Sequence, residues 1–382
     1  MTPNLGFGLY IHWPFCQSKC PYCDFNSHVE TAIDQKRWQQ AYLAEIARCG
    51  AETTGRILDS VYFGGGTPSL MDPDLVSLIL ERVRQTWRQS NDIEITLEAN
   101  PTSVEAGRFA GFRNAGINRV SIGVQALQDQ HLRQLGRLHT VNDAIGAIEI
   151  ATATFPRVNF DLIYARQHQS LTDWRSELQL ALSLGTSHMS LYQLTIEEGT
   201  VFHARQMRGL LLGLPKDDQA ADMFDLTQEL CNAAGIPSYE VSNHASMGQE
   251  SRHNLIYWRG GDYVGIGPGA HGRLLHDGHR VATEGIKTPQ AWLDGVERRA
   301  NGELPRTLML SKDAGAEYLM MGLRVKEGIR PSHYRHLTGL DLPKGKIQDL
   351  IGLRLLMEGQ DSLHATQSGI LVLDAILRDV LA

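Results

Sequence analysis

The sequence predicts an α/β protein in which a partial (β/α)6 barrel of the TIM type is followed by a smaller, mostly helical C-terminal domain. Apolar strand-like stretches alternate with amphipathic helical stretches up to about residue 235. Such alternation produces a parallel sheet with right-handed crossovers. Polar motifs fall just after the strands, where the functional groups of such barrels gather. Beyond residue 237 glycines become frequent, and from Lys312 onward the pattern is mostly helical.

Six stretches have the length and apolar composition of strands, with amphipathic patterns between them. The expected strands are 9–13, 60–63, 93–98, 119–123, 158–163 and 188–193, and the expected helices include 36–49, 74–87, 104–115 and 141–151. A further strand is expected at 238–242 and a short apolar hairpin at 368–373. The predicted domains are a core at 1–237, a connecting segment at 238–311 and a C-terminal domain at 312–382.

Composition is that of an ordinary soluble protein. The chain has 382 residues, of which 42% are hydrophobic and 21% charged, and 36 basic against 43 acidic residues give a net charge of -7. This balance argues against a dedicated nucleic-acid binder. No apolar run approaches the roughly 18 residues of a membrane span, and the first ten residues lack the pattern of a signal peptide. A cytoplasmic protein is therefore expected.

The five cysteines fall into two groups. Cys49 and Cys231 stand alone in helical stretches and are expected to be small buried apolar residues. The other three, Cys16, Cys20 and Cys23, lie within eight residues of one another. An odd number of cysteines without a secretion signal does not indicate a disulfide framework. The cluster of three therefore predicts a bound inorganic centre.

The residues of this cysteine loop are compatible with three kinds of site. A structural zinc site needs a fourth ligand, which His12 or His28 could supply. A redox Cys-x-x-Cys pair would leave Cys16 without a role. On a four-iron cluster, three thiolates would leave one iron free to bind a small molecule that accepts an electron.

The spacing Cys-x3-Cys-x2-Cys resembles the signature of radical S-adenosylmethionine (SAM) proteins. Its flanks, YIHWPFC at 10–16 and CPYCDFNSH at 20–28, resemble the anaerobic coproporphyrinogen oxidase group and, within it, the HemW heme-chaperone branch. The resemblance runs along nearly the whole chain, including the C-terminal helical domain. It implies a [4Fe-4S] cluster on Cys16, Cys20 and Cys23, with SAM on the open iron.

The same resemblance implies a SAM site at the ends of the strands. Glycine lets a backbone approach a ligand closely, and Gly65, Gly66 and Thr67 match the motif that holds the methionine amino group. Glu98, at the end of the next strand, is assigned to the ribose hydroxyls. The other cofactor contacts that the resemblance implies are Tyr10, Tyr22, Gln125, Arg137 and Asp161.

The chain departs from the family after the segment that contains Asp161. The family usually has a loop with glycine and proline at this place, whereas this chain has Ala165-Arg166-Gln167-His168-Gln169-Ser170. The shape of this loop beside the cofactor is therefore expected to differ.

Within the resemblance, the parent activity would be anaerobic oxidation of coproporphyrinogen, a radical decarboxylation. Two features argue against it. The dehydrogenases carry a fourth cysteine two residues after the third, where this chain has Phe25. They also have a longer segment before the first motif, whereas nine residues precede Tyr10 here. The cysteines and the SAM residues are present, so radical chemistry stays open.

The argument for a heme carrier rests on the segment 253–258, HNLIYW. A histidine imidazole is a natural axial ligand of heme iron. On a helix, Tyr257 would lie one turn after His253 on the same face, and Trp258 one turn after Asn254. The segment resembles the His-Asn-x-x-Tyr-Trp motif associated with heme binding in the heme-chaperone branch. The ligand itself stays open, because His244, His271 and His276 are near in sequence.

The sequence thus predicts a cytoplasmic heme chaperone that binds a [4Fe-4S] cluster, SAM and heme. By resemblance, it would pass heme to apo-hemoproteins, with respiratory b-type cytochromes as recipients and peripheral membrane association through them. A cluster-dependent homodimer is a further expectation of the resemblance. The alternatives are an oxygen-independent coproporphyrinogen III oxidoreductase and, less favoured, a methyltransferase or heme-degrading member of the superfamily.

Overall fold

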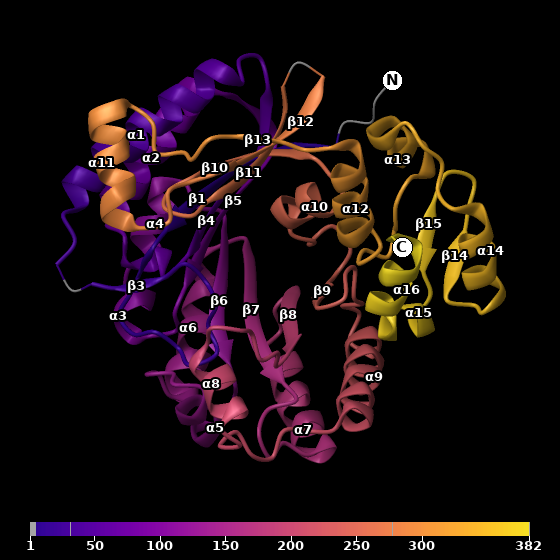
Figure 1. The fold of residues 1–382 in the computed structure, drawn as a ribbon. Helices are drawn as coiled ribbons and strands as arrows, with labels where there is room; N and C mark the ends of the chain where they lie inside the picture. Colours follow the sequence, from indigo (N-terminus) through magenta and orange to yellow (C-terminus); the bar gives the residue numbers. More distant parts are fainter. Residues whose placement is uncertain (1–4, 31, 277, 382) are drawn as a thin grey trace.

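The computed structural model describes residues 5–30, 32–276 and 278–381, and its centre is one large sheet (Figure 1). Among the described residues this sheet has eleven strands in the order β13-β12-β11-β10-β1-β4-β5-β6-β7-β8-β9. The strands are β1 (Phe7–Trp13), β4 (Ile57–Gly65), β5 (Arg88–Ala99), β6 (Arg119–Gln125), β7 (Arg157–Tyr164), β8 (His188–Gln193), β9 (Asn243–Ala245), β10 (Asp262–Ile266), β11 (His271–His276), β12 (His279–Glu284) and β13 (Thr307–Leu308).

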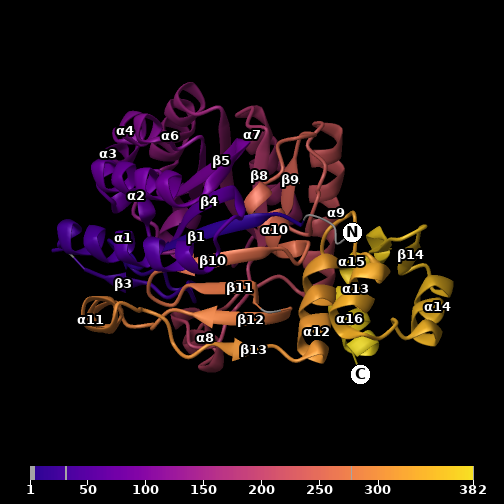
Figure 2. The same cartoon turned by 90° about the horizontal axis from the view of Figure 1, so that it is seen from above.

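The six strands predicted for the barrel are confirmed as β1 and β4 to β8. Each pairs in parallel with the next along the sheet. The structure adds β10 in parallel on the other side of β1, and the antiparallel strands β11, β12 and β13 continue from it. Figure 2 shows these strands extending the sheet beyond β1. The segment 238–311 therefore supplies five of the eleven strands, with β9 at one edge of the sheet and β10 to β13 at the other, while its predicted limits as a domain stay a prediction.

Most helices of this part of the chain cover the outer face of the barrel, whereas α10 (Arg252–Trp258) lies against its inner face. The others are α1 (Gln35–Glu52), α2 (Pro73–Thr86), α3 (Ser103–Ala106), α4 (Phe109–Ala115), α5 (Asp129–Gln134), α6 (Val141–Thr154), α7 (Leu171–Ser183), α8 (Val201–Met207), α9 (Asp217–Ala233) and α11 (Pro289–Arg299). Local signals start several of them, such as the capping box of Thr140 and Asp143 in α6. Among the described residues no helix combines the length and apolarity of a membrane span.

The period-two alternation of the strands separates an apolar face from a polar one. Leu9, Ile11 and Trp13 of β1 are fully buried in the apolar core beneath the helices. Tyr10 points to the opposite, inner face, where its ring stacks on Tyr62 with centroids 6.2 Å apart. The inner face of the barrel therefore carries the polar and aromatic side chains from which a site can be built.

The C-terminal domain has an apolar core of its own. It contains α12 (Ser311–Gly322), α13 (Pro331–Thr338), α14 (Lys344–Gly352), β14 (Leu356–Glu358), β15 (Leu363–Ala365), α15 (Gln367–Leu371) and α16 (Leu373–Leu381). The predominance of helix confirms the prediction, but the hairpin predicted at 368–373 is wrong. Thr366 caps a helix there by accepting a bond from the Gly369 backbone N–H at 3.0 Å. The hairpin is formed by β14 and β15 instead.

Two further predicted elements differ from the structure, and each contains a buried carboxylate. The helix predicted at 104–115 is divided into α3 and α4, and the Glu105 carboxylate there accepts a bond from the Asn100 backbone N–H at 2.9 Å. The strand predicted at 238–242 is a turn before β9. The buried Glu240 accepts bonds from the Ser242 backbone N–H and the Asn243 amide, both at 2.9 Å.

Candidate cluster and cofactor site

The three clustered cysteines lie in a loop at the carboxyl end of β1. Two short parallel strands, β2 (Phe15–Cys16) and β3 (His28–Val29), bring the ends of the loop together. All three thiols are half-buried and free. The Asn26 side chain fixes the loop to the sheet, because its amide donates to the carbonyls of Pro268 and Lys287, both at 2.9 Å.

The surroundings of the thiols fit a cluster better than a zinc ion. Among the described residues no three His, Cys, Asp or Glu side chains are gathered as one metal ion would require. His12, a suggested fourth zinc ligand, has both ring nitrogens engaged, with Tyr10 Oη at 3.0 Å and the Asn26 carbonyl at 2.9 Å. A four-iron cluster needs only thiolates from the loop and spaces them more widely. Burial raises the pKa of Cys16 and Cys23, so iron binding would release protons from them.

A chain of hydrogen bonds joins the cysteine loop to the ends of β4, β5 and β6. The Thr67 hydroxyl lies 3.5 Å from Cys16 Sγ and accepts a bond from the Asn100 amide at 3.1 Å. Arg137 donates to Asn100 Oδ1 at 2.6 Å, to the Gly123 carbonyl at 2.7 Å and to Cys20 Sγ at 3.4 Å. Arg137 thus places a cation beside a cluster thiol. Asn100 is not among the predicted site residues, although its place directly after the end of β5 was a signal.

Glu98 sits at the centre of the predicted SAM site. Its carboxylate accepts bonds from the Tyr62 hydroxyl at 2.8 Å and from the Gly65 backbone N–H at 3.2 Å. Gly65 has φ +110°, and a Cβ there would lie 2.5 Å from the His12 ring. A Cβ on Gly66 would lie 2.6 Å from the Phe15 carbonyl oxygen. Both glycines are therefore required for the close packing of this turn.

Burial raises the pKa of Glu98 to about 7 and that of Asp161 to about 6, from ordinary values of 4.5 and 3.8. The folded state therefore binds the Glu98 proton more tightly than the unfolded state, and ionisation lowers stability as pH rises from 4.5 to about 7. Over this window we expect the wild type to lose about 3 kcal/mol of unfolding free energy relative to Glu98→Gln. Urea unfolding at a series of pH values measures the difference, and parallel curves would contradict it. Asp161→Asn is the matched variant. Relative to it, the wild type should lose unfolding free energy between pH 3.8 and about pH 6.

The remaining predicted SAM residues lie around this centre. Asp161 accepts a bond from the Asn159 amide at 2.8 Å on the inner face of β7. Gln125 ends β6 with φ +73°, a conformation that favours glycine. The Tyr22 ring lies against α8, with its centroid 6.3 Å from that of Phe202, and burial raises its pKa.

The loop that departs from the family contains a buried arginine. Arg166 donates to the carbonyls of Gln125 at 3.2 Å and Ile163 at 2.9 Å, and it forms an ion pair with the fully buried Glu177. Ala165 and His168 have φ values of +55° and +60°, in the region where glycine is favoured. The loop without glycine thus adopts left-handed turns, and its arginine holds the backbone of Gln125.

The segment 253–258 forms α10 inside the barrel, with His253 and Tyr257 on one face as predicted. His253 is 1% exposed, and both its ring nitrogens have partners. Nδ1 lies 2.7 Å from Ser60 Oγ, and Nε2 lies 2.5 Å from Tyr257 Oη. Burial lowers the pKa of His253 to about 3, so the ring is neutral. In this arrangement no nitrogen of His253 is available to bind iron.

Tyr62 connects this helix to the SAM site. Its ring stacks on that of His253 with centroids 5.0 Å apart, while its hydroxyl bonds to Glu98. Trp258, on another face of α10, packs against Tyr239 with centroids 5.9 Å apart. The Asn254 backbone N–H bonds to the capping Ser251. The predicted heme motif therefore has two sides: His253 and Tyr257 lie toward Tyr62 and Glu98, whereas Trp258 lies toward Tyr239.

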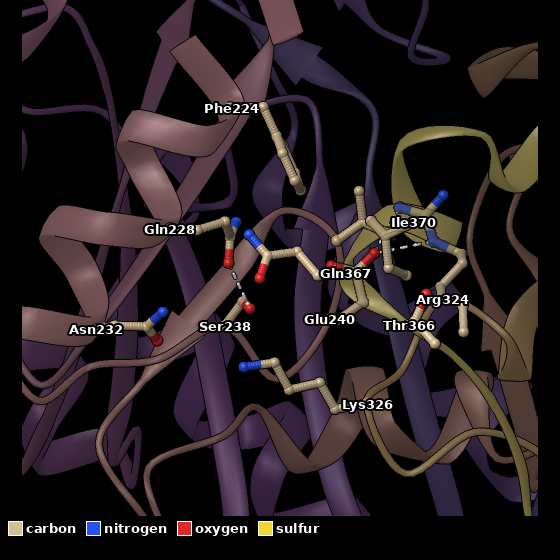
Figure 3. Close-up of a pocket in the computed structure, with 12 residues that line it drawn as sticks. Phe224, Gln228, Asn232, Ser238, Glu240, Arg324, Lys326, Thr366, Gln367 and Ile370 are labelled. Atoms are coloured by element: carbon tan, nitrogen blue, oxygen red, sulfur yellow. Dashed lines mark hydrogen bonds and ion pairs between the residues drawn. The ribbon is translucent and has the colours of Figure 1, made fainter. Parts of the chain in front are cut away.

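Two hollows open on the described surface near these elements. A small one beside the cysteine loop is lined by Cys20, Asn100 and Arg137 among others. A larger one, with an accessible volume of about 110 Å³, lies between α9 and the C-terminal domain (Figure 3). Two of its polar contacts are internal pairs, Arg324 with Glu240 and Gln228 with Ser238 at 2.7 Å. None of the predicted site residues lines the larger hollow.

The partial barrel and its three-cysteine loop define a radical SAM protein. Residues 10–181 match the radical SAM superfamily model, and residues 310–372 match the HemN C-terminal domain. The heme chaperone HemW of Escherichia coli is 37% identical over 379 residues, which cover 98% of each chain. The chain therefore belongs to the HemW family, whose membership in the radical SAM superfamily implies a [4Fe-4S] cluster and SAM.

Two further proteins are similar to the chain along most of its length. A cattle (Bos taurus) protein named "Radical S-adenosyl methionine domain-containing protein 1, mitochondrial" is 37% identical over 98% of this chain and 87% of its own length. The structure of coproporphyrinogen III oxidase (HemN) from Escherichia coli has a TM-score of 0.80 at 20% identity, over 98% of this chain and 90% of that one. At this identity the second match establishes the fold alone.

Proposed function

We propose that this protein is a heme chaperone that binds heme, a [4Fe-4S] cluster and SAM and delivers heme to apo-hemoproteins. The observation that carries the proposal is that the HNLIYW segment forms a helix whose His253 stacks on Tyr62, the residue that also donates a hydrogen bond to Glu98. The full-length similarity to a protein named heme chaperone HemW supports it.

The chain's own residues have distinct roles in this proposal. Cys16, Cys20 and Cys23 hold the cluster, which together with SAM supplies one-electron chemistry when bound. Gly65, Gly66 and Thr67 receive the methionine end of SAM at the turn after β4. Glu98 accepts hydrogen bonds from the ribose hydroxyls of SAM, and Arg137 pairs with the carboxylate of SAM. The remaining walls of the SAM site are formed by Tyr10, Tyr22, Gln125 and Asp161.

Heme binds at α10 in this proposal, with His253 organising the helix. For His253 itself to reach iron, it would have to leave the hydroxyls of Ser60 and Tyr257. Each buried bond left unmade costs about 1–3 kcal/mol. Ligation of iron by His253 would therefore require a movement of α10, whereas a His253 that keeps these bonds anchors the helix beside Tyr62.

The partners and location follow the family resemblance. We place the protein in the cytoplasm, with respiratory b-type cytochromes as recipients and peripheral association with membranes through them. A homodimer that depends on the cluster is part of the same proposal. Their support is the resemblance and the ordinary, acidic composition of the chain.

An anaerobic heme titration of the cluster-reconstituted protein tests the proposal. We expect saturable binding with a shifted Soret band in the wild type, weakened about tenfold in His253→Ala because α10 loses its anchor. Failure of the wild type to bind would reject the chaperone. Release of carbon dioxide from coproporphyrinogen III under reducing conditions would identify the porphyrinogen oxidoreductase instead. Equal affinity in both proteins would keep the chaperone and remove His253 from its site.

A further inference from the structure

Asn100 is a half-buried residue that directly follows β5, and its side-chain amide lies between two of the clustered thiols. Its Nδ2 donates to the Thr67 hydroxyl at 3.1 Å, and that hydroxyl lies 3.5 Å from Cys16 Sγ. Its Oδ1 accepts a bond from Arg137 Nη2 at 2.6 Å, while Nη1 of the same guanidinium lies 3.4 Å from Cys20 Sγ. One amide therefore contacts two side chains that donate to different thiols.

The amide fixes the direction in which each of these donors points. Because Nδ2 of Asn100 can only donate, the Thr67 oxygen accepts there and its own proton is left for the neighbouring thiol. Both protons of Arg137 Nη2 are used, one on Asn100 Oδ1 and one on the Gly123 carbonyl at 2.7 Å. The planar guanidinium is thereby held with Nη1 facing Cys20.

The position of Asn100 is set in turn by a buried carboxylate. Its backbone N–H donates to Glu105 at 2.9 Å, and Glu105 is 1% exposed. The same carboxylate accepts bonds from the Ser69 hydroxyl and, at 3.3 Å, from the Thr102 hydroxyl. These bonds fix the turn that leaves β5, so the amide is held in place by the backbone of that turn.

The charge of Arg137 suits a neighbouring cluster. Its hydrogen bonds run to an amide, a carbonyl and a thiol, and within the described part of the chain no carboxylate pairs with it. A reduced cluster carries one more negative charge than the oxidised cluster, and its net charge and the hydrogen bonds to its sulfurs set its reduction potential. A cation and a hydroxyl that face two thiolates therefore stabilise the reduced form more than the oxidised form.

We propose that Asn100 is a positioning residue that raises the reduction potential of the [4Fe-4S] cluster by holding Thr67 and Arg137 against two cluster thiolates. The inference rests on the proposed cluster binding and adds to it a residue that tunes electron uptake. Asn100 acts through its two neighbours, because its amide atoms contact Thr67 and Arg137 and not a thiol.

The test measures the reduction potential of the anaerobically reconstituted full-length protein by dithionite titration followed by electron paramagnetic resonance. SAM is left out, so that contacts of Arg137 with SAM do not enter. Asn100→Leu nearly keeps the side-chain volume and removes both amide bonds. We expect a tenfold change in the one-electron equilibrium, which makes the potential about 59 mV more negative than that of the wild type. Iron content should stay at about four atoms per chain, because all three cysteines remain.

Asn118→Leu is the matched control. The Asn118 amide accepts a bond from the Ile95 backbone N–H and donates to the Ile93 carbonyl, both at 2.7 Å, but it lies directly before β6, at the end of the sheet away from the cysteines. Both variants should unfold at lower urea concentration than the wild type, whereas the potential should change only in Asn100→Leu. A merely structural role of Asn100 would leave the potential of Asn100→Leu equal to that of the wild type.

Thr67→Val tests whether Asn100 acts through the hydroxyl. Alone, this variant should lower the potential by less than Asn100→Leu, because the Arg137 contact remains. Combined with Asn100→Leu, it should lower the potential little further, since the hydroxyl is then no longer directed at the thiol. Fully additive shifts would overturn the inference, because they would show that the two residues act independently.

The outcomes separate this inference from the proposed function. A wild type that takes up no iron would reject cluster binding itself. A wild type with a cluster and an unchanged potential in Asn100→Leu would overturn the role of Asn100 and leave the proposed function standing. If Asn100→Leu takes up no iron, Asn100→Ser removes the same two bonds without added apolar bulk. The same negative shift is expected of it, and a wild-type potential in that variant would overturn the inference.

Discussion

Replacing Cys16 by alanine is expected to reduce the iron content of the anaerobically reconstituted protein from about four atoms per chain to near zero. With three thiolates, one iron of the cluster is already without a protein ligand, and removing Cys16 leaves two. Cys16 also begins the loop, in the strand pair of β2 and β3, and its Sγ faces the Thr67 hydroxyl. Iron analysis and the visible absorption spectrum measure the effect.

Cys231→Ala is the matched control for this experiment. Cys231 is fully buried in α9, as the sequence predicted, and burial raises the pKa of its thiol. The variant should keep the iron content and spectrum of the wild type, because the cysteine loop is intact. An unchanged cluster spectrum in Cys16→Ala would reject the ligand assignment.

Replacing Glu177 by alanine is expected to lower the free energy of unfolding by about 3–5 kcal/mol, because it leaves a buried charge without its partner. The Glu177 carboxylate pairs with Arg166, which is 2% exposed, and accepts a bond from the Leu127 backbone N–H at 2.6 Å. It also accepts a bond from the Gln169 amide at 3.1 Å. Urea unfolding of the two proteins measures the loss.

The same variant should weaken SAM binding, because Arg166 also holds the carbonyl of Gln125 in its left-handed conformation. Glu327→Ala provides the control, since the Glu327 pair with Arg259 is more than two-fifths exposed on both sides. Its removal should change stability by less than about 1 kcal/mol. A Glu177→Ala protein as stable as the control would mean that Arg166 finds other partners.

Much of the fold could be predicted from local patterns. Strands β1 and β4 to β8 lie where apolar stretches predicted them, because each carries its own strong signal of composition and spacing. The errors occurred where a side-chain hydrogen bond to the backbone overrides that signal. Glu240, at the predicted strand 238–242, turns the chain through bonds to Ser242 and Asn243. Thr366 begins a helix in place of the predicted hairpin.

The sequence by itself determined the cysteine loop, the order of the polar strand ends and the helical spacing of His253 and Tyr257. These are properties of neighbouring residues, so spacing and resemblance are sufficient to find them. Only the tertiary structure decided that Ser60, 193 residues away in sequence, occupies one nitrogen of His253. It likewise decided that Arg166 supports the backbone of Gln125. The physical reason is that hydrogen-bond satisfaction depends on which elements pack together, and sheet register and domain packing set that across the whole chain.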